Sequence, residues 1–418
     1  MWRLFPLIFI ALQGLVYYTF IKFLKTTKIY KPSLRWWALV PFILFNGAFI
    51  FISLIWGRTF SPPDWFKVIG VYPFYIWMAA TFFISIWLLI GKAIKLPFEI
   101  PLWLAKIFKP LREKINNLKE QKAVKQVDKS RRKFVRYATV GISTYAFGGA
   151  VYGMVKSDDY KIEHIDIKIN NLPTELKGVT LTLISDIHAG MYMEEDEMRH
   201  YADVVNELNS DIVCIPGDFV NFQVDAIHPF NRAFRELKAK HGIYGALGNH
   251  DFFQDGEYVA KAINNESPVQ ILRNQHRKLT INGKDLFVLG VDDTISSGTK
   301  QNAIVLDYID RMHAYLLKNE PTYEISPKLL LCHKPYAFDE IAARNIFDLT
   351  LSGHTHGGQV VPLKFGDFSL SFAATVSKYI EGHYKTGKSN MYVSRGIGCV
   401  GLPIRINCPP EVTKIKLV

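Results

Sequence analysis

Acidic residues are scarce in the first third of the chain. Of the 418 residues, positions 1–136 hold 5 Asp or Glu against 22 Lys or Arg, whereas the remainder holds 33 against 28. The net charge of +12 therefore divides into +17 for the first part and −5 for the second. A catalytic domain that binds nucleic acid is usually basic, so the acidic balance after residue 136 argues against a nucleic-acid partner.

Ionisable side chains are almost missing from three long apolar runs, Phe5–Phe23, Trp36–Trp56 and Val68–Ile90. Each run is close to or above the ~18–20 residues that a helix needs to cross a bilayer. No small-residue cleavage site is obvious after the first run, so a cleaved signal peptide is not indicated. The runs also lack the acids and bases that mark an ion path, and nothing in them suggests a transporter. We predict three transmembrane helices in residues 1–91.

Basic residues set the predicted orientation of these helices. The connection between the first two runs is rich in Lys and Arg, whereas the next connection has only Arg58 and Lys67, offset by Asp64. The positive-inside rule then places the first connection and residues 92–136 in the cytoplasm. We predict residues 92–136 to be a basic linker, within which 102–127 is expected either as an amphipathic helix on anionic lipid or as a solvated helix.

Residues 137–155 are uncharged and contain several Gly and Ala. They follow Ser130-Arg131-Arg132-Lys133-Phe134-Val135-Arg136, which resembles a twin-arginine export signal in an internal position. The segment is therefore expected as a fourth transmembrane helix or as a signal anchor of that kind. Both alternatives place residues 156–418 outside the cytoplasm.

From Tyr160 the pattern changes to short β-type runs that alternate with helical runs. The predicted strands are Tyr160–Ile169, Val179–Ile184, Ile212–Ile215, Ile243–Leu247, Val269–Leu272, Leu286–Val291, Lys328–Leu331 and Leu349–Leu351. The predicted helices are Glu195–Leu208, Pro229–Lys240, Gly256–Asn264, Ala303–Leu317 and Tyr336–Arg344. This alternation predicts an α/β domain, and no internal repeat or low-complexity tract interrupts it.

Five clusters of metal-ligand residues each follow a predicted strand. They are Ser185-Asp186-Ile187-His188, Gly217-Asp218, Gly248-Asn249-His250-Asp251, His333 and Gly353-His354-Thr355-His356. Taken singly, each has a plain structural role, such as a helix N-cap for Asp, a turn residue for Asn or a core position for His. Sites in α/β sheets gather at the carboxyl ends of strands, so the five together favour one converging site.

Imidazole and carboxylate ligands suit borderline cations such as Zn, Fe and Mn, and an Asp oxygen can bridge two of them. Two such ions, roughly 3.5–4 Å apart, polarise a phosphoryl oxygen and lower the pKa of a bound water to give hydroxide. The clusters therefore predict hydrolysis of a phosphoester by in-line attack of a metal-bound hydroxide.

The five clusters resemble the motif series of the calcineurin-like metallophosphoesterase superfamily, over about Val179–Val361. The resemblance implies a four-layer α/β/β/α sandwich for residues 156–418 and two divalent ions of Mn, Zn or Fe. It also implies a role for each motif residue. One metal would be held by Asp186, His188 and His356, the other by Asn249, His333 and His354, with Asp218 as the bridge. His250 would face the phosphate, oriented by Asp251.

The subgroup of exported or membrane-anchored bacterial members of that superfamily is resembled by Gly353-His354-Thr355-His356-Gly357-Gly358-Gln359, Cys332-His333-Lys334-Pro335 and Pro403-Ile404-Arg405. The four expected spans depart from the simplest exported members, and they predict a multi-pass protein of the bacterial inner membrane. Expected substrates are phosphomonoesters or phosphodiesters, including lipids or envelope polymers. Two alternatives stay open. One is a sensor or scaffold that binds a phosphorylated ligand without turnover, and the other is a cytoplasm-facing pyrophosphatase of lipid precursors or nucleotides.

Two further expectations concern the C-terminal part. Arg395 lies in a Gly-rich segment and is expected either to contact the substrate phosphate or to form a surface salt bridge. Of the four cysteines, Cys214 and Cys332 fall in apolar strands and are expected to pack there. Cys399 and Cys408 are close in sequence, and outside the cytoplasm they are expected to be able to form a disulfide.

Overall fold

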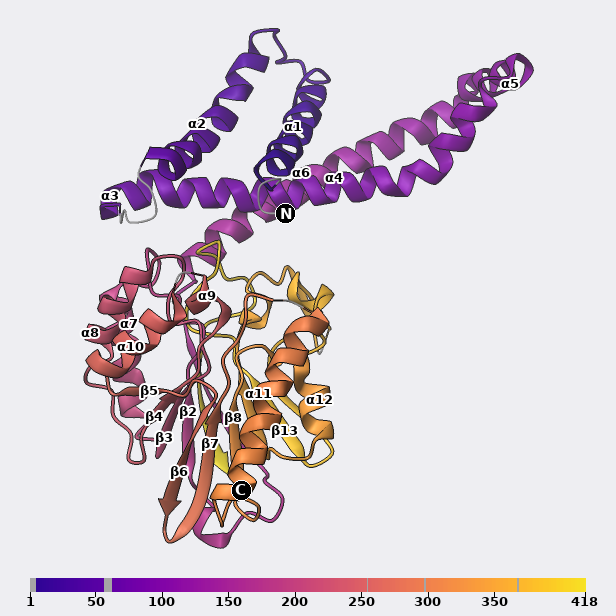
Figure 1. Cartoon of the computed structure of the whole chain (residues 1–418). Coiled ribbons are helices and arrows are strands. Elements are labelled where there is room, and N and C mark those ends of the chain that lie inside the picture. The colour runs from indigo at the N-terminus through magenta and orange to yellow at the C-terminus, as the bar shows by residue number, and fades with distance from the viewer. Residues whose placement is uncertain (1–4, 56–61, 254, 297, 367) are drawn as a thin grey trace. The chain divides into compact units, whose positions relative to one another are not determined.

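The computed structural model describes residues 5–55, 62–253, 255–296, 298–366 and 368–418. The chain divides into two compact units, Met1–Met154 and Val155–Val418. Both are drawn in Figure 1. Each unit is described by itself.

The first unit is helical. Its helices are α1 (Phe5–Leu24), α2 (Leu34–Ile55), α3 (Asp64–Phe66), α4 (Tyr72–Ala105), α5 (Lys109–Glu120) and α6 (Lys122–Val155), with a π-helical turn, η2 (Lys67–Val71), before α4. Two stretches, Leu7–Leu24 and Asp64–Ala105, have the length and composition of membrane spans among the residues described. The run expected at Trp36–Trp56 forms α2 as far as Ile55, and Trp56 lies outside the described residues.

A small polar cluster joins α1, α2 and α4 in their otherwise apolar surroundings. The Gln13 Nε2 donates to Asn46 Oδ1 at 2.8 Å, and Asn46 Nδ2 donates to Gln13 Oε1 at 2.7 Å. The Trp77 Nε1 donates to the same Gln13 oxygen at 3.1 Å. Hydrogen bonds of this kind hold helices together where water is excluded.

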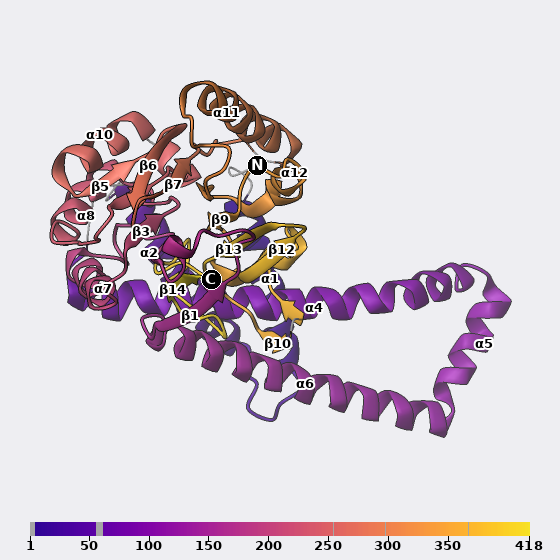
Figure 2. The ribbon, with the colours of Figure 1, turned by 90° about the horizontal axis from the view of Figure 1, so that it is seen from below.

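The basic linker is helical rather than irregular. The helix α4 continues through Ala105, α5 follows after a short turn, and α6 begins at Lys122 and runs to Val155 without a break. Figure 2 shows α5 joining the distant ends of α4 and α6. The expected amphipathic helix over 102–127 is thus divided among three helices, because turns at 106–108 and at Gln121 interrupt it.

The second unit contains two six-stranded mixed sheets, which confirms the predicted α/β class. In the first sheet the order is β1 (Lys161–Ile167), β14 (Glu411–Leu417), β2 (Thr180–Leu183), β3 (Ile212–Ile215), β4 (Ile243–Gly245) and β5 (Val269–Ile271). In the second it is β12 (Gly382–Thr386), β13 (Ser389–Val393), β9 (Leu349–Ser352), β8 (Lys328–Leu331), β7 (Lys284–Gly290) and β6 (Gln275–Ile281). A separate hairpin pairs β10 (Leu363–Phe365) with β11 (Phe368–Leu370).

The two sheets bury one apolar cluster between them, to which Leu181 and Ile212 of the first sheet and Leu329 and Leu351 of the second contribute. The other face of the first sheet is covered by α7 (Glu195–Glu207), α8 (Ile227–Ala233) and α10 (Gly256–Glu266). The other face of the second is covered by α11 (Gly298–Asn319) and α12 (Phe338–Ala343). Figure 1 shows these two groups of helices on opposite sides of the strands.

Local sequence explains why these helices form where they do. The first turn of α7 contains three acidic residues, which the positive end of the helix dipole favours. Met198, Tyr201 and Val205 recur at helical spacing and are buried against the sheet. At the start of α10 the Asp255 side chain accepts hydrogen bonds from the backbone N–H groups of Glu257 and Tyr258 and so caps the helix.

Several elements differ from the sequence-based expectation. The helix expected over Pro229–Lys240 ends at Ala233, because Phe234 leaves the helical region with ψ of 8°. The strands β6 and β10 to β14 were not predicted. Both β13 and β14 pair with strands distant in sequence, β9 and β1 among them, and local periodicity carries no information about such pairing.

Candidate metal centre

All five predicted clusters lie just beyond the carboxyl ends of strands. In the first sheet β2, β3 and β4 end at Leu183, Ile215 and Gly245, and in the second β8 and β9 end at Leu331 and Ser352. The clusters follow these ends directly. Because the two sheets pack face to face, loops from both meet at one edge.

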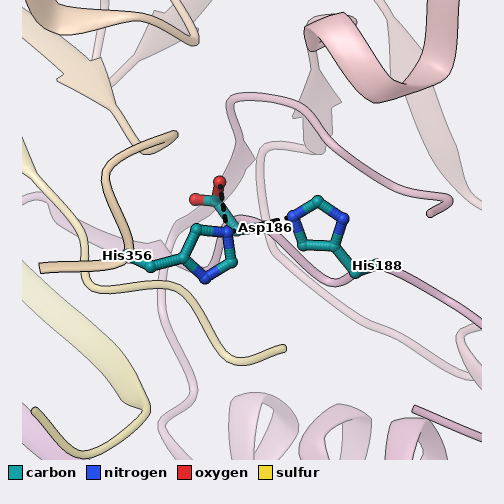
Figure 3. A group of neighbouring side chains, drawn as sticks. All are labelled: Asp186, His188 and His356. Atoms are coloured by element: carbon teal, nitrogen blue, oxygen red, sulfur yellow. Dashed lines mark hydrogen bonds and ion pairs between the residues drawn. The ribbon is translucent and has the colours of Figure 1, made fainter. Parts of the chain in front are cut away.

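One group of side chains combines Asp186, His188 and His356, whose ligand atoms all lie within 4.8 Å of one another. The Nε2 atoms of the two histidines are 3.0 Å apart, and His356 Nε2 lies 3.4 Å from Asp186 Oδ1. All three residues are buried. Figure 3 shows the two rings and the carboxylate turned toward a common point. The structure thus brings together the residues expected at the first metal.

A second group combines Asp218, His333 and His354, again within 4.8 Å. The His333 Nε2 lies 3.1 Å from Asp218 Oδ2, and His188 Nε2 of the first group lies 3.5 Å from the same oxygen. One carboxylate oxygen of Asp218 therefore faces histidines of both groups. This is the position that a bridging ligand requires.

The backbone is strained at these residues. Asp186, His188, Asp218, His354 and His356 all have φ between 50° and 71°. Among the described residues, the other non-glycine positions with positive φ are asparagines and Gln359. Asn, Asp and His enter this region more readily than other side chains, but each such position still costs of the order of 1–3 kcal/mol. Such strain persists only where surrounding structure imposes it, and it gathers at functional sites.

Glycine is required at Gly217, immediately before Asp218. Its φ is 110°, and a methyl group placed there would meet the backbone N of Gly248 at 2.6 Å and the His333 ring at 2.8 Å. No L side chain fits that space. The glycine therefore lets the Asp218 loop approach both the Asn249 loop and His333.

The donor set fits divalent cations. Asn249, the first residue of α9 (Asn249–Phe252), is buried, and its Oδ1 has no hydrogen-bond partner. The His188 Nδ1 is buried without a hydrogen-bond partner as well, whereas the His333 Nε2 faces the Asp218 carboxylate at 3.1 Å. Buried polar atoms are normally satisfied, so the unpaired amide oxygen of Asn249 beside buried carboxylates indicates a place for a cation. A mixture of imidazole, carboxylate and amide oxygen suits ions such as Mn, Zn and Fe.

Electrostatics at the site point the same way. Burial lowers the pKa values of His188, His354 and His356 well below the usual range, so their rings are neutral with lone pairs available. Burial raises the pKa of Asp186 to about 6. For Asp218 burial alone would raise the pKa, but the charge and hydrogen bond of His333 lower it well below the usual range. Burial lowers the pKa of His333 in turn, but the Asp218 carboxylate raises it to about 10, so in the absence of a cation His333 carries the positive charge beside the carboxylates. The buried carboxylates of Asp186 and Asp218 thus lie close together, and a positive charge between them would stabilise both.

His250 and Asp251 differ in part from expectation. The His250 ring contacts His188 with centroids 4.6 Å apart, and it is buried beside Asp218, as expected for a residue that faces the substrate. However, the His250 Nδ1 lies 3.2 Å from the backbone O of Asn221, which therefore orients the ring. Asp251, the expected partner of the ring, instead accepts hydrogen bonds from backbone N–H groups.

The Asp251 carboxylate accepts four backbone N–H groups. They come from Gly248, Asp218, Phe219 and Val220, at 2.8–3.1 Å. Burial and the neighbouring Asp218 carboxylate raise its pKa to about 8. Asp251 therefore ties the Asp218 loop to the Gly248–Asn249 loop, and it positions metal ligands rather than the His250 ring.

Arg395 forms salt bridges with protein carboxylates. Its Nη2 lies 2.7 Å from Glu163 Oε1, its Nε lies 2.8 Å from Glu411 Oε2, and its Nη1 lies 3.9 Å from Glu381 Oε2. Of the two expected roles, the structure shows the salt bridge, although at a largely buried position rather than on the surface.

The expected disulfide between Cys399 and Cys408 is not formed, and all four cysteines are free. The Cys408 thiol instead donates to the backbone O of His356 at 3.0 Å. Cys214 and Cys332 are buried, as expected.

Sequence reasoning missed one residue behind the site. Arg405 is buried, and its Nη2 lies 3.5 Å from His356 Nδ1. The guanidinium also donates to the backbone O atoms of Arg395 and Gly396 at 2.9 and 3.1 Å. Arg405 thus fixes the segment that packs against the His356 turn. A single Arg in an irregular tail gives no local signal of that role.

Comparison with known proteins agrees with this geometry. Residues 179–358, which contain all five clusters, match the family model of the calcineurin-like phosphoesterases. A zebrafish protein described as a transmembrane protein with metallophosphoesterase domain is 31% identical over 275 residues, covering 64% of this chain and 60% of that protein.

Two bacterial relatives, both described as uncharacterised metallophosphoesterases, are also similar. One from Helicobacter pylori J99 is 29% identical over 259 residues, covering 62% of this chain and 64% of its own length. One from Bacillus subtilis is 27% identical over 299 residues, covering 69% and 97%. The chain thus spans less than two thirds of the zebrafish and Helicobacter proteins.

Proposed function

We propose that this chain is a membrane-anchored phosphohydrolase that uses two divalent cations to cleave phosphomonoesters or phosphodiesters. Support comes from the match of residues 179–358 to the family model of the calcineurin-like phosphoesterases. The observation that carries the proposal is the position of Asp218. An oxygen of its carboxylate lies within 4.8 Å of a ligand atom of His188, and also within 4.8 Å of ligand atoms of His333 and His354. One cation in each group, of Mn, Zn or Fe, would be held by imidazole rings and shared through Asp218.

Each side chain has a part in this reaction. When bound, the two cations would polarise the phosphoryl oxygen and activate water. Asp186, His188 and His356 would hold one of them, and Asn249, His333 and His354 the other. The leaving alkoxide also needs a proton, and a side chain of the protein must supply it.

His250 is placed for that transfer. The backbone O of Asn221 accepts from its Nδ1, so the neutral ring carries its lone pair on Nε2. Burial lowers the pKa of His250, so the resting ring is neutral. Its Nε2 would accept the proton that is released when water is activated and would then pass this proton to the leaving alkoxide. His250 is therefore proposed as the acid for the leaving group.

Removal of metal is expected to abolish turnover. The full chain, solubilised and treated with a chelator, should lose hydrolysis of generic aryl phosphomonoesters or phosphodiesters, and added Mn or Zn should restore it, because phosphoryl polarisation depends on the cations. Hydrolysis and bound metal are measured together, the latter by elemental analysis. Turnover that persists in metal-free protein would contradict the proposal.

The variant His250→Ala serves as the control in the same experiment. It removes proton transfer but no proposed ligand, so we expect bound metal to be unchanged and kcat to fall by about 10²–10⁴-fold. A sensor that binds phosphorylated ligands without turnover would show no hydrolysis in either protein. Unchanged kcat would remove His250 from the mechanism.

We further propose that the chain is a multi-pass protein of a bacterial inner membrane with residues 156–418 outside the cytoplasm. Support comes from the excess of basic residues in 92–136 and from the apolar stretches Leu7–Leu24 and Asp64–Ala105. Fusion of alkaline phosphatase after Ser157 should give active enzyme in cells. If a fluorescent reporter that works only in the cytoplasm is active at that position instead, the orientation is reversed.

A further inference from the structure

A nearly uncharged, apolar segment follows the last metal-ligand motif. Residues 357–376 contain one Lys and one Asp, and they form the hairpin of β10 and β11 and the turn after it. Among the side chains that the structure describes in this segment, five large apolar ones are exposed, from 44% up to 83% of their area. They are Leu363, Phe365, Leu370, Phe372 and Val376, and we call them the apolar rim. In the hairpin Leu363 lies opposite Leu370, so the exposed apolar side chains gather in one short region, and such a region is typical of a surface that binds a protein or a membrane.

The apolar rim is fixed to the metal centre. A methyl group placed on Gly358, in the turn that begins at His356, would meet the Ser371 side chain at 2.6 Å, so hairpin and turn are in close contact. Lys364 of β10 forms an ion pair with Glu381. Movement of the hairpin away from the His356 turn would break both contacts.

The same edge of the domain receives the chain from α6. The strand β14 is antiparallel to β2, with Thr413 opposite Leu183, and β1 is parallel to β14, with Lys161 opposite Glu411. The first residue of β1 therefore lies at the edge where β2 ends and the metal ligands begin. Arg395 connects this strand to the hairpin, because it pairs with Glu163 of β1 and with Glu381.

The connection between α6 and this edge is short. The helix α6 ends at Val155 and β1 begins at Lys161, so five residues separate them. Fully extended, they span at most about 18 Å. If residues 137–155 of α6 form the membrane helix expected from the sequence, the edge of the domain at which β1 begins stays within this reach of the bilayer surface.

We propose that the apolar rim docks on the bilayer, with its side chains in the boundary between head groups and acyl chains, and that the metal centre takes a lipid-borne phosphoester from that surface. The inference rests on the proposed function and names its substrate class. The apolar rim lies in a segment that is apolar and almost without charge, and such a segment suits the boundary of a bilayer. The chain also links this domain covalently to apolar helices of membrane-spanning length, so a bilayer is within its reach.

A probe without an activity readout tests the docking. The full chain is placed in lipid vesicles, and an environment-sensitive fluorophore is attached at Phe372→Cys or, as a matched control, at Ile325→Cys. Both residues are 83% exposed, but Ile325 precedes β8, at the end of the sheet opposite to His333. Signal from the labelled unsubstituted chain is subtracted, because Cys399 is partly exposed.

We expect the emission of the fluorophore at position 372 to shift to the blue and to be quenched by a quencher carried on lipid acyl chains. The emission of the fluorophore at position 325 should neither shift nor be quenched. Equal behaviour at both positions would overturn the proposal. A shift without lipid quenching, together with cross-linked dimers, would show that a second copy covers the rim and would also overturn it.

Hydrolysis then tests the substrate class. In the double variant Phe365→Ser/Phe372→Ser, turnover of a phosphomonoester lipid in vesicles should fall at least about tenfold, because two large apolar side chains no longer insert into lipid. Turnover of a soluble aryl phosphate should be unchanged. Ile325→Ser should alter neither. Equal loss on both substrates, or no loss, would refute the lipid assignment. If the unsubstituted chain hydrolysed neither substrate with metal bound, the proposed function itself would fail.

Discussion

Asp218→Asn is expected to abolish metal-dependent hydrolysis in the full chain. Asparagine keeps the size of the side chain but removes its negative charge and one of the two oxygens. The oxygen Oδ2 lies 3.1 Å from His333 Nε2 and 3.5 Å from His188 Nε2, so the loss affects both ligand groups at once. A cation pair stabilises the transition state by several kcal/mol, and its loss corresponds to about a thousandfold or more in kcat/KM.

Steady-state hydrolysis of an aryl phosphoester, measured beside metal content, checks this expectation. The matched control is Asp225→Asn, which makes the same chemical change at an exposed position outside the ligand groups. It should retain activity. Circular dichroism shows whether both variants are folded. Retention of most of the turnover by Asp218→Asn, with two metals still bound, would mean that Asp218 is not the bridge.

Gly248→Ala is expected to have the second large effect. Gly248 has φ of −95°, which any residue adopts, so the demand for glycine at this position is purely steric. An added methyl group would overlap the Asp218 carboxylate and approach the Asp218 backbone N to 2.5 Å. The Asp218 side chain must then move, and a displacement of about 1 Å at a reacting site costs about a hundredfold in rate.

Activity and metal affinity of Gly248→Ala are compared with those of Gly148→Ala. Gly148 lies in α6, and a methyl group added there would have no neighbour within 4 Å, so the second variant makes the same substitution without a clash. We expect Gly148→Ala to behave as the unsubstituted chain. If Gly248→Ala bound metal with equal affinity and kept its rate, the close approach of the two loops would not matter for function.

The positions of the site residues could be predicted from sequence to a large extent, because the signals are local. Strand-like runs such as Ile212–Ile215 and Lys328–Leu331 have the predicted bounds. Ligand-type residues directly after them must lie at the ends of the strands. Convergence then follows from the geometry of parallel sheets, and the structure places Asp186, Asp218 and the histidines accordingly.

What could not be predicted depends on contacts between distant segments. Asp251 was expected to act on its neighbour His250, but its carboxylate accepts N–H groups of residues 218–220, some 30 positions away. Arg405 shows the same limit, since its contact with His356 spans 49 positions. Cys399 and Cys408 illustrate the reverse case, in which nearness in sequence did not produce the expected bond.

The place of β14 in the first sheet also bears on how the protein is made. β1 and β2 do not pair with each other, because β14 lies between them and pairs with both. During synthesis the ribosome releases β1 and β2 more than two hundred residues before Glu411. Until that strand arrives, each presents an unpaired edge that attracts other chains. The nascent domain therefore carries these unpaired edges over most of its translation, and the first sheet is complete only when the last strand has been made.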